Sequence, residues 1–241
     1  KQPSQQTPSA GDDEFLAASS GSGFAVSKVG HVVTNHHVID GCQRVFIHDG
    51  RRQLAAHIVA KDSTSDLAIL KADFTPQHIF SLSDEKPEIL QDVFVAGYPF
   101  GMEISSSVKV TKGIVSSLTG IADNFARLQI DAAIQPGNSG GPIIDLKGNI
   151  VGVAVAKLDL KAVMKAFGVV PEGTNFGVKS SVLNNMLDSL SIETKTPNKE
   201  FIPKSQIAKQ IEKGTYYLSC WMDMAQIERL RATKVMFENI R

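Results

Sequence analysis

One serine in this chain lies in a loop that its neighbours make rigid and open. The loop is the stretch QPGNSGGP at residues 135–142, and Ser139 is its only hydroxyl. Glycine allows backbone conformations that a side chain forbids, whereas proline fixes φ and removes an amide donor. Ser139 could therefore be a nucleophile, with the amides of Gly137 and Ser139 directed at a developing oxyanion. The same pattern also marks an ordinary turn between strands, so a base and an acid are needed elsewhere to decide.

Candidates for the base and the acid lie upstream of this serine. His36 and His37 end a β-prone run, and an imidazole at the mouth of a cleft can act as a general base. If the strand continues, adjacent residues point to opposite faces, so only one of the two would serve a given site. Asp66 directly precedes a short apolar run, where its carboxylate could be partly desolvated beside an imidazole. Asp62 and Asp73 are rivals, and all these residues could instead be ordinary surface or turn residues.

The elements that must position these side chains are short strands separated by Gly, Asp, Ser and Pro clusters. Regular short strands with turn signals predict an all-β fold. The strands fall into two series of similar length with about six strands each, for which two antiparallel barrels in tandem are the simplest packing. The β-prone runs are residues 24–27, 31–35, 44–48, 54–60, 67–71, 78–81 and 93–96, followed by 107–118, 127–130, 142–144, 150–156 and 175–179.

Composition and strand pattern divide the chain into four segments. Residues 1–13 are rich in Gln, Pro, Ser and Thr and predict a disordered linker. Residues 14–97 are expected to form an N-terminal barrel that carries the histidine and the aspartate. Residues 98–190 are expected to form a C-terminal barrel that carries the serine, closed by a helix over residues 181–190 with a serine as its N-cap.

The fourth segment, residues 191–241, is a C-terminal extension with a short α/β pattern. After a linker, it predicts a helix over residues 205–213, a strand over 215–221 and a helix over 224–234. The extension is too apolar for a free tail, so we expect it to dock on the barrels or on a neighbouring chain, as in a homo-oligomer. Residues 158–173 form an insertion that is longer than a minimal hairpin. It is either a regulatory loop or a surface feature without effect on the rate.

Composition excludes several functional classes. The 241 residues carry 25 basic and 25 acidic side chains, without the clustered basic face that nucleic-acid binding needs. No apolar run approaches the about 20 residues of a membrane span. No signal peptide is recognised, and because the chain begins with Lys1 we expect a processed or shortened form. Cys42 and Cys220 fit no zinc spacing, and they form either a disulfide in an oxidising compartment or two unpaired thiols.

Taken together, the motifs resemble one peptidase family. The order His, Asp, Ser over two β series is similar to the chymotrypsin-like serine proteases, and more closely to the HtrA/Deg branch of bacterial trypsin-like peptidases. Five motifs carry this resemblance in family order: GSGF at residues 21–24, TNHHV at 34–38, SDLAIL at 65–70, GYPFG at 97–101 and DAAIQPGNSGGP at 131–142. Chance agreement of several ordered motifs is negligible beside the risk that a single motif carries.

The resemblance implies a role for each matching residue. The catalytic histidine falls on His37, the acid on Asp66 and the nucleophile on Ser139. The oxyanion hole falls on the amides of Gly137 and Ser139, with Asn138 between them. Pancreatic-type relatives carry an aspartate at the position of Asn138, which binds the new N-terminus after zymogen cleavage. Its replacement implies control by mobile loops instead of N-terminal trimming. The implied reaction is peptide hydrolysis through an acyl-enzyme, without a metal or an organic cofactor.

The resemblance also implies a first specificity pocket with small or apolar walls. A preference for Lys or Arg is not expected, because a buried carboxylate would be needed to pair with the cation. The expected substrates are polypeptides cut after small or medium apolar residues, with a role in protein quality control and a periplasmic or secreted location. Lys157 could narrow or polarise the pocket. The expected pocket residues are Ala133, Ile134, Gln135, Val155, Ala156, Lys157, Asn175, Phe176 and Gly177.

Other functions compete with this interpretation. A trypsin-like domain can act as a non-hydrolytic scaffold, or its intact triad can be held in a resting state with a collapsed oxyanion loop. An α/β hydrolase is disfavoured, because its serine lies in G-x-S-x-G and its histidine comes last in the chain. HtrA proteins usually carry PDZ domains after the protease, and the 191–241 extension does not match one. The chain is therefore either shortened or a stand-alone peptidase.

Overall fold

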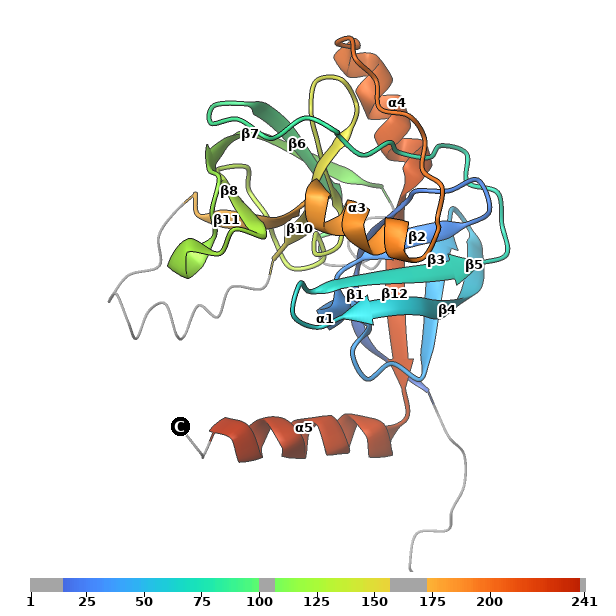
Figure 1. Cartoon of the computed structure of the whole chain (residues 1–241). Helices are drawn as coiled ribbons and strands as arrows, with labels where there is room; N and C mark the ends of the chain where they lie inside the picture. Colours follow the sequence, from blue (N-terminus) through green and yellow to red (C-terminus); the bar gives the residue numbers. More distant parts are fainter. Residues whose placement is uncertain (1–14, 100–106, 157–172, 239–241) are drawn as a thin grey trace, which may run out of the picture.

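The fold consists of two closed β-barrels of six strands each (Figure 1). This computed structural model describes residues 15–99, 107–156 and 173–238. The strand pairs around both barrels are antiparallel. The predicted chymotrypsin-like architecture of two six-stranded antiparallel barrels is thereby confirmed.

Each barrel closes on itself through a fixed order of neighbouring strands. Around the first barrel the order is β1 (Leu16–Ala25), β12 (Thr215–Met222), β3 (Arg44–Asp49), β4 (Arg52–Asp62), β5 (Leu67–Ala72) and β2 (His31–Thr34). Around the second barrel it is β10 (Ile150–Val155), β11 (Asn175–Lys179), β8 (Arg127–Ile130), β7 (Lys109–Ser117), β6 (Asp92–Gly97) and β9 (Pro142–Ile144).

Three clusters of buried apolar side chains stabilise this arrangement. One fills the first barrel around Ile47 and Leu70, and another fills the second barrel around Leu128 and Ile143. The third cluster contains residues of both barrels and two helices, and in it Phe24 packs edge-on against another phenylalanine. Burying one such side chain is worth about 1.5–3 kcal/mol, so the third cluster holds the barrels together. The site between the barrels is therefore built on a rigid frame.

The strand β12 shows where the C-terminal extension docks. It inserts between β1 and β3, and in Figure 1 it runs, coloured red, among the blue and cyan strands of the first barrel. It pairs with β1 from Leu16 opposite Met222 to Phe24 opposite Thr215. The predicted helix–strand–helix pattern of the extension is confirmed, and the expected docking is on the chain's own first barrel.

The expected division of the chain at residue 97 differs from the observed strand pairing. The strand β6 pairs with β7 and β9, so it belongs to the second barrel. The predicted strand at residues 78–81 is reduced to a single bridge between Ser81 and Lys195. The first barrel therefore lacks a strand from its own half of the chain, and β12 supplies it. The expected linker after residue 190 is also packed, because Ile192 is buried in the third cluster.

Helices connect and cover the barrels: α1 (His36–Ile39), the 3₁₀ helix η1 (Ile121–Asp123), α3 (Ser180–Ser189), α4 (Lys204–Gly214) and α5 (Met224–Glu238). The condition that the strand continues through the histidine pair is not met, because α1 begins at His36. The predicted closing helix is confirmed as α3, but its N-cap is Lys179 and makes no side-chain bond. The insertion at residues 158–172 lies outside the described residues, as does the expected linker at residues 1–13. No helix in the described ranges has the length and apolar character needed to cross a bilayer.

Half-buried His78 is expected to make stability depend on pH. Its ring packs edge-on against Phe80 with centroids 4.8 Å apart. Burial lowers the pKa of His78 from 6.5 to about 4, with smaller contributions from Lys195 and Lys213. Between these two values the unfolded chain binds the proton and the folded chain does not, so stability falls as the pH drops through this window. After allowance for partial exposure, we expect His78 to account for about 1–2 kcal/mol of this loss.

This expectation is checked by urea unfolding of the wild type and His78→Gln at pH 7 and pH 4.5. The difference in unfolding free energy between the two proteins should shift in favour of the variant at the lower pH. The exposed Gln53 carries no titratable group, so Gln53→Ala offers a control that should keep the pH dependence of the wild type. Equal pH dependence in the wild type and His78→Gln would contradict the assignment.

Candidate active site

Three side chains from distant parts of the chain form one line of hydrogen bonds between the barrels. Nε2 of His37 lies 2.9 Å from Oγ of Ser139. Nδ1 of the same ring lies 3.0 and 2.9 Å from the two carboxylate oxygens of Asp66. His37 lies on α1 and Asp66 directly before β5, both in the first barrel, whereas Ser139 lies before β9 of the second. The structure therefore brings together the three residues that the motifs indicate.

The backbone around Asp66 aligns its carboxylate with His37. Asp66 has a φ of 59°, a left-handed conformation that aspartate tolerates better than most residues. Its carbonyl accepts a hydrogen bond of 2.9 Å from Nδ2 of Asn35, and Oδ1 accepts one of 3.0 Å from the backbone amide of His37. The two alternative acids have other surroundings. Asp62 accepts a hydrogen bond from the amide of Thr64, and Asp73 is exposed to solvent.

The charge of Asp66 is maintained although the side chain is largely buried. Burial raises the pKa of Asp66, but the hydrogen bonds and charge of His37, together with Arg127, outweigh it and hold the pKa below its ordinary value. Asp66 is therefore a carboxylate at neutral pH, and it can stabilise an imidazolium at His37.

The loop that carries Ser139 is held by β1 of the first barrel. Oγ of Ser22 donates to the carbonyl of Gly137 at 2.7 Å, and the amide of Ser22 donates to the carbonyl of Ser139 at 2.8 Å. Gly137 and Gly140 have φ values of 97° and 82°, which a side chain rarely adopts. A Cβ on Gly140 would also collide with the carbonyl oxygen of Ser22. The glycines are therefore required by backbone conformation and by close approach.

Two backbone amides of this loop are available to an acceptor. The amide of Asn138 donates to Gln135 at 2.9 Å, so both ends of the peptide between Gly137 and Asn138 are bonded. Within the described parts of the chain, the amides of Gly137 and Ser139 donate no hydrogen bond. The Asn138 side chain is buried, and its Oδ1 has no partner there. The two amides can thus bind an oxygen atom that a substrate supplies.

The amide of Ala156 makes a contact with Ser139 that the sequence did not predict. It donates to Oγ of Ser139 at 3.1 Å. The direction of the bond between Ser139 and His37 follows from Asp66, because a carboxylate only accepts and Nδ1 must therefore donate to it. In the neutral ring Nε2 then accepts the proton of the Ser139 hydroxyl. This arrangement requires the imidazole tautomer that carries its proton on Nδ1, facing Asp66.

The expected pocket residues are only partly gathered in one cavity. Val155 and Phe176 line a cavity of about 350 Å³ that also reaches His37 and Asp66. Of the expected walls before the serine, Ala133 and Gln135 are exposed and Ile134 packs against the second-barrel core. Behind them, Asn175 donates to the carbonyl of Ala132 at 3.0 Å, and a Cβ on Gly177 would point at Ile143 of the core. Lys157 lies outside the described residues.

Arg127 is a further cavity residue that the motifs did not indicate. It lines the same cavity, and its Nη1 is buried without a hydrogen-bond partner among the described residues. Burial lowers the pKa of Arg127, whereas the nearby Asp66 raises it. Its neighbours Leu128 and Ile130 alternate into the core, which places Arg127 on the opposite face of β8. Strand alternation was therefore the signal available in the sequence.

Comparisons with known proteins agree with this geometry. The family described as "Trypsin-like peptidase domain" matches residues 21–153. The chain is 40% identical over 190 residues to the uncharacterized protein y4bJ of Sinorhizobium fredii, covering 78% of the chain and 30% of that protein. It is 39% identical over 142 residues to a probable periplasmic serine endoprotease, DegP-like, of Hahella chejuensis, covering 57% of the chain and 29% of that protein. The chain thus spans less than a third of these two relatives.

Solved structures of similar proteins share the fold. The serine endoprotease from Yersinia pestis matches with a TM-score of 0.59 and 29% identity, over 72% of this chain and 58% of that one. The HtrA-type protease AlgW with a decapeptide matches with a TM-score of 0.58 and 27% identity, over 71% of this chain and 51% of that one.

Proposed function

This chain belongs to the trypsin-like peptidase family, in its HtrA-type branch, and on that premise we propose that it is a serine endopeptidase. In this proposal Ser139 is the nucleophile, His37 the general base and Asp66 the residue that orients His37. One observation carries it: the three side chains form a continuous hydrogen-bonded line. This is the arrangement that activates a serine hydroxyl.

The proposed reaction begins with the attack of Ser139 Oγ on a peptide carbonyl carbon. As the C–O bond forms, the hydroxyl proton passes to Nε2 of His37, and Asp66 stabilises the resulting imidazolium. His37 then gives this proton to the leaving amine, and the C–N bond breaks to leave an acyl-enzyme. Water, deprotonated by His37, hydrolyses the ester and restores Ser139.

The proposed oxyanion hole consists of the amides of Gly137 and Ser139. Their lack of acceptors within the described residues supports this role. In comparable sites, one such donor is worth about 3–4 kcal/mol of transition-state stabilisation. The bonds from Ser22 Oγ and the Asn138 amide support a loop that is held in one conformation before substrate binds.

The proposed substrates are polypeptides cut after small or medium apolar residues. Those candidate wall residues that the structure describes are apolar or uncharged, and none offers a carboxylate to a Lys or Arg side chain. A role in protein quality control is part of this proposal and rests on the family resemblance. The formation of a homo-oligomer stays a prediction.

An extracytoplasmic location is also proposed. Cys42 and Cys220 form a disulfide in the structure, the outcome that the sequence left open against two free thiols. Disulfides persist in oxidising compartments such as the periplasm. Several DegP-like relatives are named as periplasmic serine endoproteases, which points the same way.

Labelling by a fluorophosphonate tests the proposed activity in the wild-type protein. We expect one label per chain, and mass spectrometry of the digested protein should locate it on Ser139. Peptides with valine before the scissile bond should be hydrolysed faster than matched peptides with lysine there. A label on another serine would refute the assignment. Labelling of Ser139 without peptide hydrolysis would favour a non-hydrolytic scaffold.

A further inference from the structure

The helix that carries His37 is too short to hold its own position. It consists of four residues, and its N-cap Asn35 makes no side-chain capping bond. A single helical turn is unstable in isolation, because nucleation costs more than one turn of hydrogen bonds returns. On its N-terminal side α1 is fixed by β2 and by Asp66. The position of His37 therefore also depends on what holds the C-terminal side of α1.

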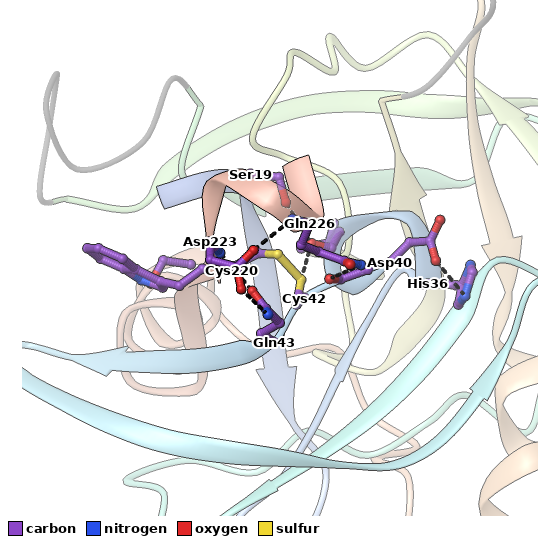
Figure 2. Close-up of a disulfide and its surroundings, with 12 residues drawn as sticks. Ser19, His36, Asp40, Cys42, Gln43, Cys220, Asp223 and Gln226 are labelled. Atoms are coloured by element: carbon purple, nitrogen blue, oxygen red, sulfur yellow. Dashed lines mark hydrogen bonds and ion pairs between the residues drawn. A yellow bond between two sulfur atoms is a disulfide. The ribbon is translucent and has the colours of Figure 1, made fainter. Parts of the chain in front are cut away.

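The C-terminal side of α1 is bonded to the extension that supplies β12 and α5 (Figure 2). Cys42 lies just after α1 and forms the disulfide with Cys220 of β12, with Cα atoms 5.3 Å apart. The amide of Cys42 donates to the carbonyl of Ile39 at 3.2 Å. The crosslink is therefore tied directly to the last residue of α1.

A reciprocal pair of hydrogen bonds lies beside this disulfide. Nε2 of Gln43 donates to Oδ2 of Asp223 at 2.6 Å, and the amide of Asp223 donates back to Oε1 of Gln43 at 2.7 Å. Asp223 also caps α5, since Oδ1 accepts the amide of Gln226 at 2.7 Å. The hydrogen bond from Gln43, with that from the Gln226 amide, lowers the pKa of Asp223 and keeps it an acceptor. One carboxylate thus joins the chain after α1 to the start of α5.

The first turns of α5 cover the turn between α1 and the disulfide. Nε2 of Gln226 donates to the carbonyl of Gly41 at 3.2 Å. Gly41 has a φ of 77°, and a Cβ there would lie 2.6 Å from Cδ1 of Leu230. This turn is therefore shaped to fit against α5.

The residue after His37 is held by the same assembly. The carbonyl of Val38 accepts a hydrogen bond of 2.9 Å from Oγ of Ser19, and Sγ of Cys42 lies 3.7 Å from the same carbonyl oxygen. Ser19 is itself paired with Cys220 in the ladder between β1 and β12. The carbonyl of Val38, next to His37, is thus in contact with Cys42 itself and with Ser19, the strand partner of Cys220.

We propose that the Cys42–Cys220 disulfide, with Gln43, Asp223 and Gln226, positions His37 against Ser139, so that peptide hydrolysis requires the oxidised cysteine pair. We call this set the C-terminal clamp. Its members are positioning residues, since within the described residues none of them bonds to Oγ of Ser139 or lines the cavity that reaches His37 and Asp66. The inference rests on the proposed function. A dithiol such as dithiothreitol would break the S–S bond in a two-electron reduction that yields two thiols, while the dithiol becomes a cyclic disulfide.

The chain's cysteine content allows a clean test, because Cys42 and Cys220 are its only two cysteines. Oxidised wild type, wild type reduced with dithiothreitol, and the double variant Cys42→Ser/Cys220→Ser are compared on one peptide substrate. We expect kcat to fall about tenfold or more in the two proteins that lack the disulfide, with KM within about twofold, since a shift of about 1 Å at a catalytic group can cost a hundredfold. Dithiothreitol should not affect the double variant.

Amide hydrogen exchange supplies a readout that does not depend on activity. Loss of the disulfide should speed exchange at residues 36–39, including the His37 amide that donates to Asp66. Gln43→Ala should have a smaller effect in the same direction, because it removes the reciprocal pair and leaves the disulfide. Val115→Ala, in the core of the second barrel and outside the cluster that joins the two barrels, controls for general destabilisation and should change neither kcat nor this local exchange.

The outcomes separate the clamp from the proposed function. If the oxidised wild type hydrolyses peptide but reduction changes neither kcat nor exchange at residues 36–39, the clamp proposal is wrong and the proposed function stands. If the oxidised wild type does not hydrolyse peptide, the proposed function fails, and the exchange measurement alone decides whether the disulfide holds α1.

Discussion

Replacing Ser139 by alanine is expected to lower kcat by about a million-fold, because no other group can form the acyl-enzyme. The change removes one oxygen atom, which contacts Nε2 of His37 and the amide of Ala156. It leaves both backbone amides of the proposed oxyanion hole in place. Some acceleration over the uncatalysed reaction should therefore persist through transition-state binding alone.

The fold should tolerate this substitution. Ser139 does not have a positive φ, so alanine fits its backbone without strain. Two hydrogen bonds are lost, which costs at most about 1–3 kcal/mol. The two hydrogen bonds from Ser22 to the loop are accepted by the backbone carbonyls of Gly137 and Ser139, which the alanine variant retains. A folded protein without activity is the expected result.

Peptide hydrolysis, fluorophosphonate labelling and a denaturation curve of Ser139→Ala check this prediction together. Ser189→Ala is the matched control, because Ser189 is exposed at the end of α3 and, among the described residues, its hydroxyl donates only to the carbonyl of Met186 in its own helix. The control should retain the wild-type rate and label. If Ser139→Ala is still labelled and active, the nucleophile lies elsewhere.

Each of the three candidate site residues lies in a motif with its own local chemistry, so the sequence alone could propose them. It could not identify the geometry that selects between the two histidines. Alternation along a strand was the argument that only one of the two histidines serves a given site, yet both residues lie on the helix α1. His36 pairs with Asp40 at 3.8 Å, whereas the amide and ring of His37 both bond to Asp66. The motif resemblance placed the role on His37, whereas the contact that distinguishes the two rings joins residues 29 positions apart and is not encoded by strand alternation.

The partners of the strands were also beyond sequence patterns. Alternation and turn signals predicted the strand that became β12, but they do not say which strands it pairs with. Its place between β1 and β3 is set by barrel closure and by the crosslink between Cys42 and Cys220, which are 178 residues apart. The same reason explains β6, which was predicted as a strand and assigned to the wrong barrel. Local propensity specifies elements, and closure of the barrels specifies their order.

Replacing Asp66 by asparagine is expected to lower kcat by about ten-thousandfold, with little change in KM. The carboxylate now accepts the Nδ1 proton of His37, which leaves Nε2 free to accept the proton of Ser139. An asparagine NH₂ group facing Nδ1 would instead favour the tautomer that carries its proton on Nε2. That tautomer cannot accept the Ser139 proton, and the negative charge that stabilises the imidazolium is also lost.

Asparagine is the appropriate substitution because it removes the negative charge of the carboxylate and keeps the backbone conformation of residue 66. Asp66 has a φ of 59°, and asparagine adopts this left-handed conformation readily, whereas alanine would add strain. The bond from Asn35 to the carbonyl of residue 66 does not involve the side chain and should survive. Steady-state kinetics on a peptide substrate, with a denaturation curve to show that the variant is folded, gives the measurement.

The matched control for this prediction is the rival acid Asp62. Its Oδ1 accepts the amide of Thr64, and a bond from Ser65 holds its pKa below the ordinary value, as expected for a turn residue. Asp62→Asn should keep an acceptor for Thr64 and leave kcat within about twofold of the wild type, since it makes no contact with His37 in the described structure. If Asp62→Asn loses activity while Asp66→Asn retains more than a tenth of it, the acid of the site has been assigned to the wrong carboxylate. If both variants keep full activity, His37 is oriented by its backbone alone.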